Sequence, residues 1–261
     1  MPHPKKRLAQ HFLHDPRILR RIVDALEPRP GETVLEIGPG PGGLTAHLRD
    51  RVSRLVAIEK DSDLIPGLRK RFPLLELVAG DALELDWHQI AGPGPFRVIG
   101  NIPYNITSPL LEQALRPPRP PVIVFLVQKE VAERVIADPG GAEYGALSVG
   151  VQSVARAERV FTVPAGAFTP RPKVDSAVLR LRPRPDPLIP DEQVAPFRRF
   201  VVGLFGFRRK QLVRGLRELV GVGPEQSTAW LLAAGLDPTA RPQELSPEAF
   251  ARLFEVVGGK S

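Results

Sequence analysis

The stretch NIPYNIT, at positions 101–107, holds both asparagines of this 261-residue chain and one of its two tyrosines. An asparagine oxygen accepts hydrogen bonds without bringing a charge, whereas an aspartate brings a charge and an apolar side chain accepts nothing. A neutral acceptor suits chemistry at the exocyclic amino group of a base, whose nitrogen lone pair is delocalised into the ring. We therefore expect Asn101 to contact such an amine; the alternative is an ordinary turn residue.

A second acceptor is available from the backbone beside Asn101. Pro103 restricts the residue before it, so we expect the carbonyl of Ile102 to be held outward, where both acceptors grip the amine and free its lone pair. Tyr104 offers a flat face on which an extruded base can stack. No strong general base is needed, so proximity and orientation would supply most of the rate. Asn105 is expected to cap the helix that follows.

A glycine-rich turn and two acids lie at the ends of other apolar runs. Gly38, Gly40 and Gly43 satisfy G-x-G-x-x-G, and Glu59 follows at the end of the second run. Glycines let a cofactor approach the backbone at the carboxyl edge of an open sheet, and an acid at this spacing accepts from a ribose. A dinucleotide is therefore one candidate ligand.

Two details favour a different cofactor. A pyrophosphate is bound by backbone N–H groups, and Pro39 and Pro41 each remove one. Glu36 places a carboxylate beside the turn, which suits a cation better than a diphosphate. S-adenosylmethionine is cationic, has a ribose and lacks phosphate, and Asp81 in GDAL is placed to accept from its adenine amino group. The alternative is a glycine turn followed by solvated acids.

The elements that position these residues form an α/β pattern. Near-continuous apolar runs, typical of buried parallel strands, alternate with helical patterns. Strands are predicted at 33–38, 54–59, 75–80, 96–102 and 121–128, with a late antiparallel pair at 158–163 and 176–182. We expect an open α/β sheet with right-handed crossovers in a domain spanning 1–184.

The C-terminal part has a different pattern. A proline-rich linker at 182–190 is followed by helical patterns only, including one continuous pattern from Pro196 to Val220. We predict a small helical domain over 185–261.

Charge points to a polyanionic partner. The formal net charge is +7, with a pI of about 10.1. A short basic cluster opens the chain at Lys5, Lys6 and Arg7. Clustered basic residues indicate nucleic-acid binding, against the alternative of a merely soluble basic surface. Seven candidates lie between 197 and 217, without an acid among them: Arg198, Arg199, Arg208, Arg209, Lys210, Arg214 and Arg217.

Several segments together resemble a known family. QHFLHDP at 10–16, LEIGPGPGGLT at 35–45 and NIPYNIT resemble the adenine dimethyltransferases of ribosomal RNA. FTPRPKVDSAVLRL at 168–181 and FGFRRKQLVRGL at 205–216 narrow the resemblance to the bacterial small-subunit branch. The resemblance implies a Rossmann-like class I methyltransferase sheet with a helical domain, acting on two adjacent adenines near the 3′ end of 16S rRNA in a pre-30S or 30S particle.

The resemblance also assigns roles to residues. It implies that Phe168 stacks on the target base opposite Tyr104; the alternative is a core phenylalanine at a loop end. Where the family usually has asparagine, this chain has His11, which contacts the cofactor through its backbone or replaces the side-chain contact. Six positions are implied to contact S-adenosylmethionine: His11, Leu13, Gly38, Glu59, Asp81 and Asn101.

Two other functions stay open. A large-subunit relative of the macrolide-resistance type shares NIPY, and a ribosome-assembly factor with little catalysis would share the basic surface.

The composition limits which other kinds of site and which location the protein can have. The chain lacks cysteine, and its five histidines form no convincing metal pattern. No run is long and apolar enough for a membrane span, so we expect a cytoplasmic protein. Nothing demands more than a monomer. Few Asn, Cys and Met residues with 30 prolines suggest heat adaptation; the alternative is a GC-rich genome, which would also favour arginine and proline.

Overall fold

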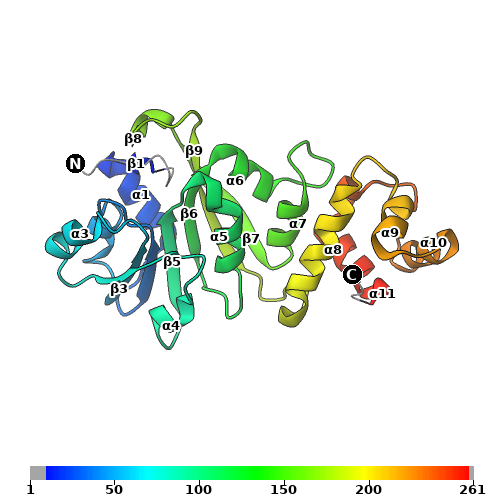
Figure 1. Cartoon of the computed structure of the whole chain (residues 1–261), viewed down its shortest axis with the longest axis horizontal. Helices are drawn as coiled ribbons and strands as arrows, with labels where there is room; N and C mark the ends of the chain where they lie inside the picture. Colours follow the sequence, from blue (N-terminus) through cyan, green and yellow to red (C-terminus); the bar gives the residue numbers. More distant parts are fainter. Residues whose placement is uncertain (1–9, 259–261) are drawn as a thin grey trace. The chain divides into compact units, whose positions relative to one another are not determined.

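A computed structural model describes residues 10–258, which form two compact units (Figure 1). The first unit comprises the chain up to Ala132 together with Ala157–Pro183, and the second comprises Glu133–Arg156 and the chain from Arg184. The sequence patterns predicted a first domain over 1–184 that included 133–156, whereas residues 133–156 belong to the second unit. The basic cluster of Lys5, Lys6 and Arg7 lies outside the described residues.

The first unit contains a seven-stranded sheet of the predicted α/β type. Its strand order is β4-β3-β2-β5-β6-β9-β7, in which the first five strands are parallel and β9 runs antiparallel to β6. Because these five strands are parallel, their carboxyl ends meet at one edge of the sheet. The strands are β2 (Thr33–Ile37), β3 (Arg54–Glu59), β4 (Glu76–Ala79), β5 (Phe96–Asn101), β6 (Ile123–Gln128), β7 (Ala155–Val163) and β9 (Ser176–Pro183).

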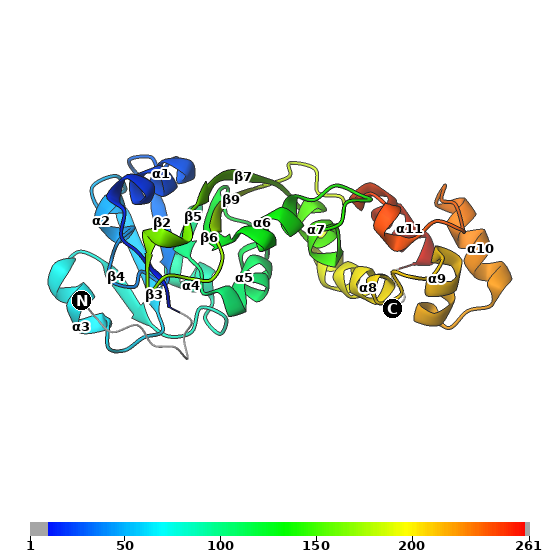
Figure 2. The same ribbon diagram turned by 90° about the horizontal axis from the view of Figure 1, so that it is seen from above.

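Helices cover both faces of this sheet. Figure 2 shows α1 and α2 on one face and α5 on the other. The helices that accompany the strands are α1 (Pro16–Leu26), α2 (Thr45–Leu48), α3 (Ile65–Arg71), α4 (Trp87–Ala91), α5 (Thr107–Ala114) and α6 (Lys129–Ile136). Among residues 10–258, no helix combines the length and the apolar character needed to cross a membrane.

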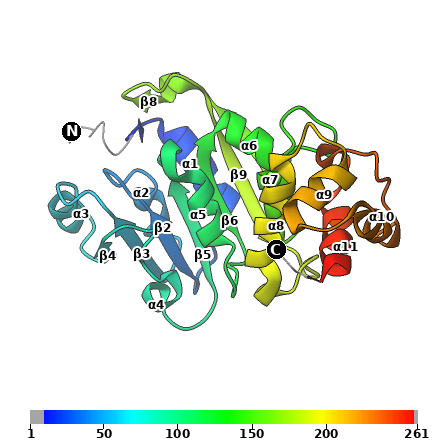
Figure 3. The same cartoon turned by 45° about the vertical axis from the view of Figure 1, so that its right-hand side comes forward.

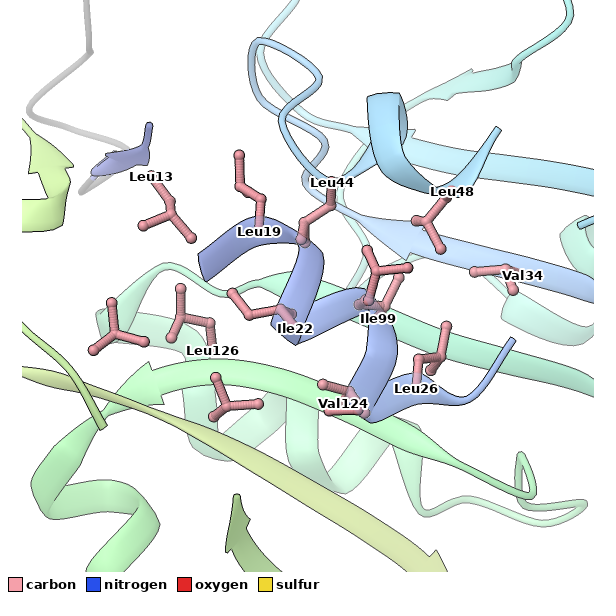
Figure 4. Close-up of a cluster of buried hydrophobic side chains, with 14 of the residues drawn as sticks. Leu13, Leu19, Ile22, Leu26, Val34, Leu44, Leu48, Ile99, Val124 and Leu126 are labelled. Atoms are coloured by element: carbon pink, nitrogen blue, oxygen red, sulfur yellow. The ribbon is translucent and has the colours of Figure 1, made fainter. Parts of the chain in front are cut away.

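Helix α1 fixes one face of the core. Asp15 caps it by accepting from the amides of Arg17 and Ile18, and Pro16 fits the first turn because its missing N–H would be unbonded there. Ile22 of this helix lies in a buried cluster with one side chain of β2, one of β5 and two of β6, as Figure 4 shows. These four are Val34, Ile99, Val124 and Leu126. Ile22 is fully buried in this cluster, so α1 is held by packing against the sheet.

Two short strands that the sequence did not predict bring distant motifs together. β1 (Phe12–Leu13), labelled in Figure 1, pairs antiparallel with β8 (Phe168–Thr169), labelled in Figures 1 and 3. The register places Leu13 opposite Phe168. A 3₁₀ turn at Ala165–Ala167 leads into β8. Two-residue strands carry no periodicity, so only the tertiary pairing creates them.

The second unit is helical around an aromatic core. Phe197, Phe200 and Leu204 of one helix pack with Phe250 and Phe254 of the last. Its helices are α7 (Ala146–Gln152), α8 (Val194–Gly206), α9 (Leu212–Val220), α10 (Pro224–Ala233) and α11 (Pro247–Val257), with 3₁₀ turns at Asp191–Gln193 and Pro242–Glu244.

The continuous helix predicted from Pro196 to Val220 is wrong. It is interrupted at 207–211, between α8 and α9. The amide of Lys210 donates to the carbonyl of Phe207, and the amide of Leu212 donates to the carbonyl of Ala240. The second bond anchors the start of α9 to a different loop, so the chain turns there and carries three basic residues in the turn.

Candidate active site

A cavity lies at the carboxyl edge of the parallel strands. Its wall includes the ends of β2, β3 and β5, the residues after β4, and the segment 10–13. All six positions expected to contact a cofactor line it, as do Ile102, Pro103 and Tyr104. The structure therefore brings together residues that lie as far apart in sequence as His11 and Tyr104.

Glycines shape the turn after β2. Gly38 has φ +66° and Gly40 has φ +57°, a backbone conformation that residues other than glycine rarely adopt. A Cβ on Gly40 would stand 3.3 Å from the ring of Phe12, so the turn also has close contact with the segment that covers it.

The amides of this turn are already used within the protein. Pro39 and Pro41 have no N–H, and the amides of Gly38, Gly40 and Gly42 all donate to other residues. Their acceptors are the carbonyl of Ile58 (2.9 Å), Glu59 Oε2 (3.0 Å) and the carbonyl of Pro39 (2.9 Å). A diphosphate would find no free amide between 38 and 42, which favours a ligand without phosphate.

Glu36 is a buried acid with one unused oxygen. Its Oε2 accepts from the hydroxyl of Thr45 at 2.7 Å, while Oε1 is buried without a partner. Burial raises the pKa of Glu36 to about 7, against the bond from Thr45 and with the help of the Glu59 charge. An unpaired buried acceptor in a cavity wall suits a positively charged ligand or a strong donor.

Glu59 is held rigidly at the end of β3. Its Oε1 accepts from the amide of Asp61 at 2.8 Å, and its Oε2 accepts from Gly40. Burial raises its pKa despite these two bonds. Each carboxylate oxygen has a second lone pair, so Glu59 retains the capacity to accept from ribose hydroxyls.

Asp81 forms an ion pair with a neighbouring residue that the sequence pattern did not indicate. Its Oδ1 accepts from the amide of Leu83 at 3.0 Å, and Lys60 forms an ion pair with Oδ2. Burial acts to raise the pKa of Asp81, but the bonds from Lys60 and Leu83 outweigh it and the pKa is lowered. Asp81 is thus an ionised acceptor, and Lys60 competes for one of its oxygens.

The amide of Asn101 has a defined orientation. Its Nδ2 donates to the backbone carbonyl of His11 at 2.9 Å. A carbonyl only accepts, so the nitrogen must face His11 and the oxygen is left for another partner. Ile102 donates its amide to Leu126 at 3.1 Å, and no hydrogen bond from another described residue reaches its carbonyl. Both expected acceptors are therefore available.

His11 and Tyr104 form one assembly. Their rings stack with centroids 5.4 Å apart and an interplanar angle of 25°. The Tyr104 hydroxyl is 2.7 Å from Ser176 Oγ, and His11 Nδ1 is 2.7 Å from the carbonyl of Pro170. Because that carbonyl only accepts, Nδ1 carries the hydrogen. The imidazole thus contacts Tyr104 and Pro170, while the His11 backbone serves Asn101.

Known proteins that are similar to this chain identify its family. The sequence model described as ribosomal RNA adenine dimethylase matches residues 2–258. The chain belongs to that family. It is therefore an adenine-dimethylating enzyme of the methyltransferase class, and the resemblance inferred from its motifs is confirmed.

Individual members of the dimethylase family are similar to this chain over nearly its whole length. Ribosomal RNA small subunit methyltransferase A of Acidithiobacillus ferrooxidans is 41% identical, over 98% of this chain and 96% of the relative. The enzyme of the same name from Pseudomonas aeruginosa is 44% identical, over 95% and 92%.

Solved structures agree in fold. A dimethyladenosine transferase from Plasmodium falciparum has a TM-score of 0.80 at 26% identity, covering 96% of this chain and 98% of that one. The 23S rRNA methyltransferase ErmE has a TM-score of 0.74 at 32% identity, covering 95% and 99%. The predicted Rossmann-like fold is confirmed.

Two side chains of this dimethylase, Phe168 and Asn105, do not lie where the sequence analysis expected them. Phe168 is buried in the core beside Leu13 and is not part of the cavity wall, so it lies where the alternative of a core phenylalanine places it. Asn105 does not cap α5. It is exposed within a 3₁₀ turn, and the cap position is occupied by Ile106 without a side-chain hydrogen bond.

The seven basic candidates differ in their surroundings. Arg198 is half-buried against Gly150 of α7, and burial lowers its pKa. Lys210 is paired with Glu218 at 2.7 Å. The other five are exposed and form no ion pair with another described residue: Arg199, Arg208, Arg209, Arg214 and Arg217.

Sequence reasoning missed the residues that hold the others in place. Phe12 packs beside Gly40, Thr45 binds Glu36, Lys60 pairs with Asp81, and Ser176 binds Tyr104. Thr45 ends the LEIGPGPGGLT segment and Ser176 lies within the FTPRPKVDSAVLRL segment, so their places in these segments were signals that could have found them.

Proposed function

We propose that this chain transfers methyl groups from S-adenosylmethionine to N6 of two adjacent adenines near the 3′ end of 16S rRNA. The substrate is a pre-30S or 30S particle, and the enzyme acts as a monomer. The observation that carries the proposal is the fixed amide of Asn101, which leaves its oxygen available in a cavity that Ile102, with its carbonyl unpaired among the described residues, also lines. The names of the relatives, small subunit methyltransferase A, support the choice of RNA.

The residues of the cavity fit this cofactor. When bound, S-adenosylmethionine supplies a methyl group attached to a positively charged sulfur. Glu36 offers its unpaired oxygen to the positive charge, and Glu59 accepts from the ribose. Asp81 accepts from the adenine amino group, with Lys60 moving aside or sharing the carboxylate. The occupied amides of the glycine turn argue against phosphate-containing alternatives.

The target amine is held by two acceptors. Asn101 Oδ1 and the Ile102 carbonyl take one hydrogen each, which draws the nitrogen toward tetrahedral geometry and exposes its lone pair to the methyl group. Tyr104, fixed by Ser176, supports the extruded base. The nitrogen becomes acidic once it is methylated, so the proton leaves to water and no strong base is required. Orientation accounts for most of the rate.

The test uses a tritiated methyl donor and small-subunit particles from a strain that lacks this methylation. We expect label on N6 of adenine, up to two methyl groups on each of two adjacent bases. Asn101→Ala should abolish transfer while its thermal unfolding stays near that of the parent chain. Absence of label on N6 with the parent chain would refute the proposal.

A second candidate has a specific observation in its favour. ErmE, a 23S rRNA methyltransferase, shares the fold over 95% of this chain. The same assay separates the two, because label would then appear in purified large subunits and not in small ones. Binding to small subunits without any transfer would instead support an assembly factor that has little catalysis.

The second unit is proposed to bind RNA. Five exposed arginines with no ion pair to another described residue provide cations for phosphates, while Lys210 must first leave Glu218. Arg198 contributes less, because it is half-buried.

A further inference from the structure

The segment 170–175, between β8 and β9, carries cations that the proposed mechanism does not use (Figure 1). Arg171 and Lys173 are exposed, and neither forms an ion pair or a side-chain hydrogen bond with another described residue. Pro172 between them is buried, so the two charged side chains lie on the outer side of the segment. Val174, next to Lys173, is 40% exposed.

Both ends of this segment are bonded to residues of the cavity wall. At its start, the carbonyl of Pro170 accepts from His11 Nδ1 at 2.7 Å. Just beyond its end, Ser176 Oγ lies 2.7 Å from the hydroxyl of Tyr104. The segment therefore borders the side of the cavity where His11 and Tyr104 stand, which is the side that takes the target base.

Backbone contacts hold the segment in place between these ends. The carbonyl of Asp175 accepts from the amide of Lys129 at 3.0 Å, and its Oδ1 accepts from the amide of Ala165 at 2.9 Å. Asp175 is thus engaged with the backbone, and it forms no ion pair with Lys173. Among the described residues, Arg171 and Lys173 are therefore unpaired cations on a segment that hydrogen bonds hold next to the cavity.

We propose that Arg171 and Lys173 bind the phosphates that flank the extruded adenine, and that Val174 packs against the neighbouring base. Extruding a base splays the phosphates on either side of it, and cations placed there hold the strand in register with the cavity. This inference rests on the proposed function and adds positioning residues to it. RNA is favoured over other polyanions because the segment borders the site that receives a base.

The test compares Arg171→Ala/Lys173→Ala with the parent chain for binding to a short single-stranded RNA that has two adjacent adenines at its centre. Loss of two phosphate contacts should reduce the slope of log K against log salt by about 1.4. With small-subunit particles as substrate, KM should rise while kcat at saturating particles stays near that of the parent chain. Arg171→Lys/Lys173→Arg should keep the parental slope.

A matched control removes the same charge from the opposite edge of the sheet. Arg29 precedes β2 and Arg116 follows α5, and both are exposed. Arg29→Ala/Arg116→Ala should leave the slope and KM unchanged. Equal S-adenosylmethionine affinity and equal thermal unfolding in all variants would exclude a folding defect.

A second arm alters the RNA instead of the protein. Replacing the phosphates beside the target adenines by neutral methylphosphonates should weaken binding of the parent chain and have little effect on Arg171→Ala/Lys173→Ala. Equal losses in both proteins, or an unchanged salt slope, would overturn the inference. A parent chain that binds this RNA with the expected slope but transfers no label to small-subunit particles would count against the proposed function and leave the phosphate contacts standing.

Discussion

At the scale of single residues, the orientation of one amide determines what the cavity can hold. Asn101 could present either its nitrogen or its oxygen, and the carbonyl of His11 selects the oxygen by taking the nitrogen. The family resemblance implies asparagine where His11 stands, yet the contact with Asn101 uses only the backbone. The change of side chain therefore leaves the acceptor intact and affects the contacts with Tyr104 and Pro170 instead.

Asn101→Asp tests the need for this orientation. A carboxylate has no hydrogen to donate to His11, so two acceptors would repel each other and the side chain would shift. A displacement of about 1 Å from productive geometry costs about 100-fold in rate, so we expect kcat to fall at least that far. Single-turnover methyl transfer measures it. Near-normal kcat for the aspartate variant would show that the contact with His11 is dispensable.

The raised pKa of Glu36 predicts that the stability of the folded chain depends on pH. Burial raises its pKa to about 7 in the folded chain, above the ordinary value of a free glutamate. Its contribution to stability is therefore fully present at low pH and is lost as pH rises through about 7. In Glu36→Gln this loss should be absent. Urea unfolding of both proteins without cofactor, between about pH 5 and pH 8, measures the difference; parallel profiles would contradict the role of burial.

The cofactor should reverse this trend at the same residue. A cation favours the ionised carboxylate, so the affinity of the parent chain for S-adenosylmethionine should rise with pH through about 7 as the proton is released. Glu36→Gln should bind more weakly at high pH and lose that part of the dependence. Calorimetry in buffers of different ionisation enthalpy detects the released proton, and equal proton release in both proteins would rule Glu36 out as its source.

At the scale of elements, the core between α1 and the sheet supports the cavity wall. Ile22 is fully buried against the strands, whereas Arg20 on the same helix is exposed. Ile22→Ala should lower the free energy of unfolding by about 2–5 kcal/mol, because it removes buried methyl groups and leaves a cavity. Arg20→Ala should change it by less than about 0.5 kcal/mol. Urea unfolding compares them, and equal effects would show that α1 is not held by this packing.

The elements also show which parts of the fold were predictable from sequence. The five parallel strands were found because buried strands are continuous apolar runs, a local property. The β1–β8 pair was missed because Leu13 meets Phe168 only after the chain has folded. The same pairing buries Phe168, which the resemblance had assigned to the target base. The break at 207–211 was missed because the amide of Leu212 is anchored by Ala240, far along the chain.

The site follows the same division. Residue types at strand ends identified Glu59, Asp81 and Asn101, because topology alone brings those ends to one edge. The partners that tune them, such as Lys60 at Asp81, come from side-chain geometry that spacing does not encode.

At the scale of the whole molecule, a net charge of +7 becomes informative only when paired and unpaired cations are distinguished. In the turn at 207–211, Arg208 and Arg209 are exposed and no ion pair joins either to another described residue, whereas Lys210 is bound to Glu218. An unpaired cation releases a counterion from RNA for each phosphate that it contacts, whereas Lys210 would have to exchange one anion for another.

Arg208→Ala/Arg209→Ala should therefore lower the slope of log K against log salt for particle binding by about 0.7 to 0.9 per lost contact. Lys210→Ala should lower it by less than Arg209→Ala does. Filter binding of unmethylated small-subunit particles across a salt series tests this order, and a larger effect at Lys210 would show that the pair with Glu218 opens when RNA binds.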